Sequence, residues 1–206
     1  MNVKIKICGM TRSTDIQAAV GAGADAIGLV FVPASPRCVS FEQARILAEM
    51  VPAEVQLVGL FMNASAKTVS ACCKQVPLTA LQFHGFESND ECRQFGLPWI
   101  KTVAMGGEQK PASLFDAWPD ACALLLDGHA AGEQGGQGKV FDWLAAPQIM
   151  QKIILAGGLN SDNVSTAIEQ VKPWAVDVSS GVEAAPAKKD IQLMKRFCNE
   201  VRATRI

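Results

Sequence analysis

The sequence predicts an α/β fold, a single-domain (β/α)8 barrel that spans residues 1–206. Short apolar runs recur at intervals of about 25 residues, and most of them are followed by signals for a helix. The runs are continuously apolar, which is typical of strands buried on both faces of a parallel sheet. The length of 206 residues lies at the compact end of the range for such barrels.

A doubly wound open sheet is the competing architecture. It usually stops at about five or six strands and carries a different glycine fingerprint. The hydrophobic content of 49% fits one large core, and no Pro/Ser-rich or charged linker divides the chain. We therefore expect eight strand-then-helix units in one domain.

The first unit opens with Lys4–Thr11, an apolar-alternating run that is too short for a helix and in which Cys8 is followed by glycine. Such a run is typical of a strand that presents a side chain at the turn after it. Ser13 is expected to cap a helix that ends near Gly21.

The next three units repeat this order of strand, loop and helix. A loop stiffened by two prolines, Val32–Arg37, follows the second strand, and Ser40 is expected to cap the second helix. The predicted strands are Ala26–Phe31, Val55–Phe61 and Thr79–Phe83, and the predicted helices are Phe41–Met50, Ala66–Cys73 and Ser88–Phe95.

The second half of the chain is less regular. A fifth strand is followed by a loop at Met105–Ala112 and at most a short helix at Ser113–Ala117, and a glycine-rich segment, His129–Gly138, follows the sixth strand. Asn160 or Ser161 is expected to cap a helix that runs to about Val171. The remaining strands are Trp99–Val103, Ala121–Leu126, Lys152–Leu155 and Trp174–Val178, and the last helix is Asp190–Arg202.

Composition argues against several classes of protein. The net charge is −1 and no basic stripe stands out, so neither nucleic acid nor an anionic membrane is the expected partner. The chain has 7 cysteines without a Cys-x-x-Cys pair, and its 2 histidines, His84 and His129, lie far apart, which argues against a metal site.

No apolar run reaches the length of about 18 residues that a membrane helix needs, and no signal region opens the chain. We expect a cytoplasmic protein, either a monomer or a homodimer.

In barrels of this kind the active site forms at the carboxyl ends of the strands. The polar and glycine residues at these ends are therefore the candidates for function. In chain order they are Cys8, Arg37, His84, Asp127, Gly157, Gly158, Asp177, Ser179, Ser180 and Gly181.

Two turns near the end of the chain predict a phosphate site. Gly157-Gly158 follows the seventh strand, and Ser179-Ser180-Gly181 follows the eighth. Backbone N–H groups approach an anion closely where glycine removes the Cβ, and this fold often holds phosphate after strands 7 and 8. One glycine pair would be an ordinary tight turn, but two such turns on adjacent strands favour a bound phosphate group.

Cys8 and Asp127 form a candidate acid/base couple. Cys8 can equally be a small buried apolar residue, and Asp127 can be a turn former. At strand ends, however, both side chains face the mouth of the barrel, the opening formed by the carboxyl ends of the strands. There we expect desolvation to raise the pKa of Asp127, and strand-end dipoles with Arg37 to lower the pKa of Cys8. A thiolate base and a carboxylic acid could then move a proton on a substrate.

Three further features have two interpretations each. Arg37, on its stiffened loop, is either preorganised for a planar carboxylate or a solvated surface charge. His84 either orients the substrate or satisfies loop carbonyls. The segment His129–Gly138 is either a lid over the mouth or a surface loop.

Taken together and in order, these motifs resemble the phosphoribosylanthranilate isomerase family over essentially the whole chain. The resemblance rests on motifs at strand ends. They are Lys6-Ile7-Cys8-Gly9, Gly28–Phe31 with Ser35-Pro36-Arg37, Leu81–Gly85, Leu125-Leu126-Asp127, Gly138-Lys139, Phe141-Asp142-Trp143, Leu155–Leu159 and Asp177–Glu183. The chain departs from the family pattern at Gln137, Ser161 and Ala187, where the family commonly has threonine, proline and glycine.

The resemblance implies a (β/α)8 barrel that catalyses an Amadori rearrangement in tryptophan biosynthesis, without metal or organic cofactor. It implies that Asp127 protonates the furanose ring oxygen of N-(5-phosphoribosyl)anthranilate, and that Cys8 removes the proton from C2. Arg37 would hold the anthranilate carboxylate. Another phosphosugar barrel, such as an epimerase or a thiamin-phosphate synthase-like transferase, and a non-catalytic phosphosugar-binding protein are the alternatives.

Overall fold

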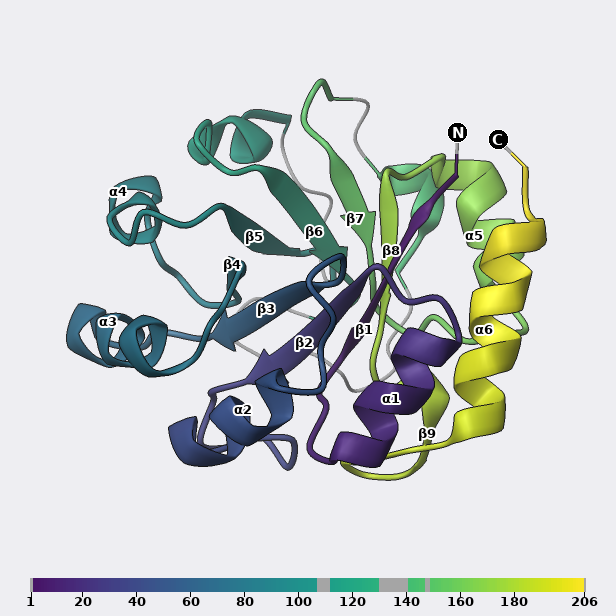
Figure 1. The fold of residues 1–206 in the computed structure, drawn as a ribbon. Helices are drawn as coiled ribbons and strands as arrows, with labels where there is room; N and C mark the ends of the chain where they lie inside the picture. The colour runs from purple at the N-terminus through teal and green to yellow at the C-terminus, as the bar shows by residue number, and fades with distance from the viewer. Residues whose placement is uncertain (1, 107–111, 130–140, 147–148, 206) are drawn as a thin grey trace.

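A computed structural model describes residues 2–106, 112–129, 141–146 and 149–205. Strands β1 to β8 close into a barrel in which each strand pairs in parallel with its sequence neighbours and β1 pairs with β8. The α-helices lie around the outside of this barrel (Figure 1). The predicted fold class is confirmed. The strands are β1 Lys4–Cys8, β2 Ala26–Val30, β3 Gln56–Phe61, β4 Ala80–Phe83, β5 Trp99–Ala104, β6 Ala123–Asp127, β7 Ile153–Leu155 and β8 Ala175–Val178.

The helices follow the predicted order, but two of the eight expected units differ. In the described residues, only the 3-10 turns η1 Ala112–Ala117 and η2 Trp143–Ala145 follow β5 and β6. The helices are α1 Ser13–Gly21, α2 Phe41–Ala48, α3 Ala66–Gln75, α4 Asn89–Arg93, α5 Val164–Val171 and α6 Ile191–Ala203, with a short 3-10 turn η3 at Ser180–Val182. Apart from His129, the predicted lid at 129–138 lies outside the described residues.

Side-chain caps explain where several helices begin. The Ser40 hydroxyl accepts a hydrogen bond from the backbone of Gln43, as expected. The cap predicted at Ser13 is wrong. Ser13 is the first helical residue and Arg12 holds the cap position, where its guanidinium binds Asp15 in the first turn at 2.6 Å.

The cap predicted for α5 at Asn160 or Ser161 is also wrong, because α5 begins only at Val164. The Asn160 side chain accepts a hydrogen bond from Asp162 N, and Asn163 Oδ1 accepts one from Asn160 N. These two amides stabilise a turn ahead of the helix.

The hydrophobic core has two layers. The larger layer lies between the strands and the helices, and the smaller fills the inside of the barrel. The inner layer consists of Val58, Ala80, Ile100, Ala123, Leu125, Ile154, Ala156 and Ala175. This inner packing fills the barrel with apolar side chains.

A small antiparallel hairpin that the sequence analysis did not predict follows β8. Strand β9 spans Glu183–Ala185, and β10 spans Lys188–Lys189. Between them Ala187 adopts a left-handed conformation with φ 62°, and its carbonyl accepts a hydrogen bond from Thr11 Oγ1 at 2.7 Å. The hairpin is thereby tied to the loop after β1. Among the described residues, no helix is long and apolar enough to cross a membrane.

Candidate active site

One cavity of about 280 Å³ opens at the carboxyl ends of the strands. Every residue proposed from the sequence lines it, so the fold brings all of these candidates together. They are Cys8, Arg37, His84, Asp127, Gly157, Gly158, Asp177, Ser179, Ser180 and Gly181.

Cys8 is the last residue of β1 and is 4% exposed. Its thiol is packed against β2, since a Cβ placed on Gly28 would lie 2.6 Å from Cys8 Sγ. Burial raises the pKa of Cys8, and the Lys6 ammonium beside it opposes that rise. The expected lowering of the thiol pKa is therefore wrong, because desolvation outweighs the nearby cations.

A buried ion pair lies below the thiol. Lys6 and Asp177 face each other across the β1–β8 pairing, with Lys6 Nζ 2.9 Å from Asp177 Oδ1. Burial favours the neutral amine, but the charge and hydrogen bond of Asp177 outweigh it and raise the pKa of Lys6. Asp177 therefore serves first as the partner of Lys6. The position of a lysine between apolar strand residues was the sequence signal for this pair.

Asp127, the last residue of β6, meets both histidines. Its Oδ2 lies 3.4 Å from His129 Nδ1 and 3.9 Å from His84 Nε2, and the two rings stack with centroids 4.5 Å apart. Burial alone raises the pKa of Asp127, but His129, with a smaller effect from His84, outweighs it and lowers that pKa. The expected rise is therefore wrong. Burial also lowers the pKa of His84 to about 4, which leaves this imidazole neutral near pH 7.

The same three side chains form the only metal-type cluster in the described residues, with ligand atoms within 4.8 Å of one another. The histidines that are far apart in the chain thus meet in space. A metal ion must lie in the plane of each imidazole that binds it. Because the rings are stacked with centroids 4.5 Å apart and an interplanar angle of only 22°, their planes do not meet close to the two rings. The arrangement therefore suits proton handling around Asp127 better than chelation.

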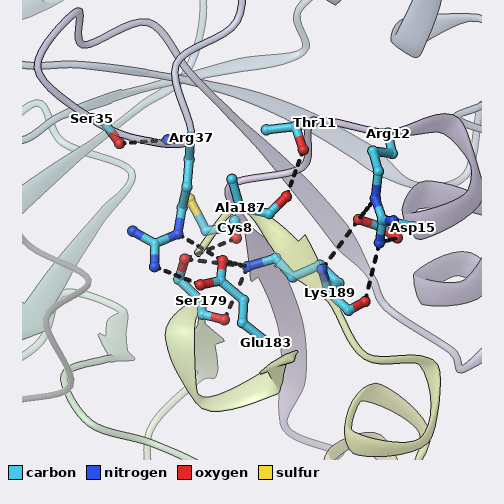
Figure 2. Close-up of polar contacts among 10 residues, drawn as sticks. All are labelled: Cys8, Thr11, Arg12, Asp15, Ser35, Arg37, Ser179, Glu183, Ala187 and Lys189. Atoms are coloured by element: carbon cyan, nitrogen blue, oxygen red, sulfur yellow. Dashed lines mark hydrogen bonds and ion pairs between the residues drawn. The ribbon is translucent and has the colours of Figure 1, made fainter. Parts of the chain in front are cut away.

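Arg37 reaches the mouth beside Cys8 and is held by an internal carboxylate (Figure 2). Its Nε and Nη2 donate to the two oxygens of Glu183, each at 2.7 Å. The hydrogen bonds from Glu183 raise the pKa of Arg37, so the guanidinium is fully charged. A role as a freely solvated surface charge is excluded, because its side chain is only 10% exposed.

The two glycine turns meet in the lining of the cavity. Gly157 and Gly158 have φ angles of 79° and 67°, which only glycine adopts without strain. A Cβ on Gly181 would collide with the carbonyl oxygen of Leu159, so the turn after β8 lies directly against the turn after β7. This is the placement that a shared phosphate site requires.

Four polar residues in or behind the cavity lining were not predicted from the sequence as site residues: Lys6, Gln82, Glu183 and Lys189. Gln82 donates from Nε2 to Thr102 at 3.1 Å, while its buried Oε1 has no hydrogen-bond partner in the described part of the chain. Gln82 lines the cavity, and its position on β4, two residues before His84, was the available signal.

Comparisons with known proteins agree on one family. The family model described as N-(5'phosphoribosyl)anthranilate (PRA) isomerase matches residues 5–200. The chain is 49% identical over 202 residues to the N-(5'-phosphoribosyl)anthranilate isomerase of Acidithiobacillus ferrooxidans, covering 98% of each chain. It is 45% identical over 205 residues to that of Thiobacillus denitrificans, covering 99% of this chain and 100% of the relative.

Solved structures give the same result. Phosphoribosyl anthranilate isomerase from Thermotoga maritima is 39% identical with a TM-score of 0.86, covering 97% of this chain and 98% of that one. A structure of the isomerase in complex with reduced 1-(o-carboxyphenylamino)-1-deoxyribulose 5-phosphate is 36% identical with a TM-score of 0.81, with the same coverage. Thiamine phosphate pyrophosphorylase from Pyrococcus furiosus, at 14% identity and a TM-score of 0.69, shares the fold alone.

Proposed function

The chain belongs to the N-(5'-phosphoribosyl)anthranilate isomerase family, and from this premise we propose how its own residues carry out the reaction. The substrate is N-(5'-phosphoribosyl)anthranilate, an aminoaldose. The product is the aminoketose 1-(2-carboxyphenylamino)-1-deoxyribulose 5-phosphate, an intermediate of tryptophan biosynthesis. One observation carries the assignment of roles: Cys8 from β1 and Asp127 from β6 line the same cavity, with Arg37 at its mouth.

Two anionic groups orient the substrate. The phosphate binds at the turns Gly157-Gly158 and Ser179–Gly181, which line the cavity next to each other. The anthranilate carboxylate binds Arg37 beside Cys8. The ribose then lies between the phosphate and the carboxylate, in the cavity that His84 and Asp127 line.

Ring opening is the first chemical step. Asp127 in its protonated form donates its proton to the furanose ring oxygen, the bond between C1 and that oxygen breaks, and the nitrogen lone pair forms a C=N iminium. His129 lies 3.4 Å from the same carboxylate and stabilises the anion that remains.

Proton transfer from C2 completes the isomerisation. The Cys8 thiolate removes the C2 proton, the C–H electrons form a C1=C2 bond, and the iminium π electrons return to nitrogen. The resulting enolamine tautomerises to the ketone. Lys6 favours the thiolate, because its charge works against the burial that raises the pKa of Cys8.

The loss of anthranilate fluorescence on supplying the substrate tests this proposal. We expect Cys8→Ala and Asp127→Asn each to lower kcat by about 10²–10⁴-fold, since each removes one proton-transfer group. Calorimetric binding of the reduced product analogue and far-UV circular dichroism should stay close to wild type. Wild-type protein that folds without turnover would refute the activity, and a near-normal rate for Cys8→Ala would refute the base.

We further propose that residues 1–206 form one catalytic domain that works in the cytoplasm, without nucleic acid or membrane partners. The described cysteines are all free thiols, which fits a reducing compartment. Monomer and homodimer both remain compatible with the family, in which monomers generated from the dimeric isomerase of Thermotoga maritima have been solved. Light scattering coupled to size exclusion decides between them.

A further inference from the structure

The contact between Arg37 and Glu183 leaves a defined edge of the guanidinium for the substrate. A guanidinium has five N–H donors, one on Nε and two on each Nη. Glu183 takes one donor from Nε and one from Nη2, each at 2.7 Å. Among the described residues, Arg37 Nη1 makes no hydrogen bond, so the edge formed by Nη1 and Nη2 keeps a parallel pair of donors. Such a pair matches a second carboxylate in a bidentate manner.

The pair of Arg37 and Glu183 is neutral overall, so on its own it would attract an anionic substrate only weakly. Lys189 changes this balance. Its Nζ donates to Glu183 Oε1 at 2.8 Å and to the Ser179 carbonyl at 2.9 Å, and Ser179 Oγ lies 3.4 Å away (Figure 2). Three acceptors around one nitrogen fit the three donors of an ammonium. Arg37, Glu183 and Lys189 therefore form a cluster with a net charge of about +1.

The hairpin β9–β10 builds this cluster, because it returns Lys189 to the side of Glu183. The Lys189 side chain is 0% exposed and that of Glu183 is 4% exposed. Neither carboxylate nor ammonium is therefore free to swing into the cavity. Buried, hydrogen-bonded side chains of this kind hold a neighbouring binding group in one orientation.

We propose that Glu183 and Lys189 are positioning residues that make Arg37 selective for the substrate carboxylate. Glu183 sets the plane of the guanidinium, and Lys189 restores the positive charge that Glu183 would otherwise cancel. The inference rests on the proposed function, since it concerns the substrate of the same site. It assigns specificity to the segment after β8, which contains no proton-transfer group of the reaction.

The test compares two substrates that differ only in the carboxylate: N-(5-phosphoribosyl)anthranilate and N-(5-phosphoribosyl)aniline. We expect Glu183→Gln and Lys189→Met each to raise KM for the anthranilate substrate by about 10-fold, the size of one charge-assisted hydrogen bond. For the aniline substrate the change should stay below about 3-fold, because the missing contact is not used. In an Arg37→Ala background, the effect of Glu183→Gln should disappear.

Thr11→Val is the matched structural control. It removes the hydrogen bond from Thr11 to the hairpin carbonyl of Ala187 without touching the cluster. We expect it to lower the melting temperature and leave the ratio of kcat/KM for the two substrates unchanged. If Glu183→Gln and Lys189→Met affect both substrates equally, or if Thr11→Val shifts the ratio as they do, the two residues are merely structural.

The design separates this inference from the function on which it rests. Absence of wild-type turnover with the anthranilate substrate refutes the function itself. Normal wild-type turnover, with variants that do not change the substrate ratio, refutes the positioning role alone. If Lys189→Met does not fold, the cycle of Glu183→Gln with Arg37→Ala still gives the answer.

Discussion

Asp127 shows how a neighbour reverses the effect of burial on a single side chain. Desolvation favours the neutral acid, yet His129, 3.4 Å away, lowers the pKa of Asp127. In the free enzyme Asp127 is therefore an anion over most of the neutral range. The acid that opens the ring is therefore a small fraction of the enzyme near pH 7, and this fraction grows as the pH falls.

His129→Gln tests that relation. Removing the imidazole removes the cause of the lowered pKa, so the pKa of Asp127 rises and more acid is present at a given pH. We expect the acid limb of kcat/KM against pH to move to higher pH, because this quantity reports groups of the free enzyme and Cys8, whose pKa is raised, sets the alkaline limb. His84→Gln is the comparison, since His84 is already neutral near pH 7, with a pKa of about 4. An unmoved limb in His129→Gln would show that Asp127 does not titrate under the control of His129.

At the scale of elements, the β9–β10 hairpin contains a strained residue. Ala187 has φ 62°, a conformation that costs an L-residue about 1–2 kcal/mol. Its carbonyl is nonetheless held by Thr11 Oγ1 at 2.7 Å, so the turn is retained.

Ala187→Gly is therefore expected to stabilise the protein. The strain relieved exceeds the entropy that glycine adds to the unfolded chain, and we expect a net gain of about 0.5–1 kcal/mol. Thermal unfolding should show a rise of about 2–4 °C per kcal/mol for a chain of this size. Ala185→Gly, in β9 with ordinary backbone angles, is the matched control and should destabilise. A lower melting temperature for both variants would show that Ala187 is not strained.

Local pattern predicted the elements well, for reasons visible at particular positions. Leu124, Leu125 and Leu126 are each at most 1% exposed, which explains why a continuous apolar run identified β6. Strand ends located the candidate site, because parallel strands deliver their carboxyl ends to one mouth. The caps predicted at Ser13 and at Asn160 or Ser161 were wrong. At α1 the cap position is held by Arg12, which binds Asp15, and ahead of α5 the side chains of Asn160 and Asn163 bind backbone N–H groups in a turn.

Features that depend on pairs from distant elements could not be predicted. His84 follows β4 and His129 follows β6, so only the closed barrel shows that their rings stack. The pKa of Asp127 is lowered rather than raised because both histidines lie beside its carboxylate. Glu183 and Lys189 lie only six positions apart, but their contact with Arg37 requires both the hairpin and the loop after β2.

At the scale of the whole molecule, the last helix fastens the barrel to its first unit. Arg202 of α6 donates to the Val3 carbonyl at 2.8 Å and to Asp25 at 2.7 Å, and both chain termini lie at this side of the molecule (Figure 1). Asp25 also accepts hydrogen bonds from Lys4 Nζ at 2.8 Å and Ile5 N at 2.9 Å. One carboxylate thus joins the start and the end of the chain.

Asp25→Asn tests this contact, because the stability difference between the wild type and the variant should depend on pH. Burial alone raises the pKa of Asp25, but its bonds to Lys4, Ile5 and Arg202 outweigh that effect and lower it below 3.8. A lowered folded pKa means that the stabilisation is complete above the unfolded pKa of 3.8 and is lost as the pH falls through the folded value. We expect the free energy of unfolding of the wild type to exceed that of the variant by about 1 kcal/mol at pH 7. The difference is modest because Asp25 is partly exposed.

Thermal unfolding of both proteins between pH 7 and pH 2 measures this difference, which should be about 2–4 °C at pH 7 and shrink below pH 3.8. Asp162→Asn is the matched control, because its ion pair with Arg196 at 2.7 Å joins α6 to the barrel at an exposed position. We expect that variant to change stability by less than about 0.5 kcal/mol at any pH. A difference for Asp25→Asn that persists unchanged to pH 2 would show that the amide lost packing rather than charge, and that the termini are not joined through this carboxylate.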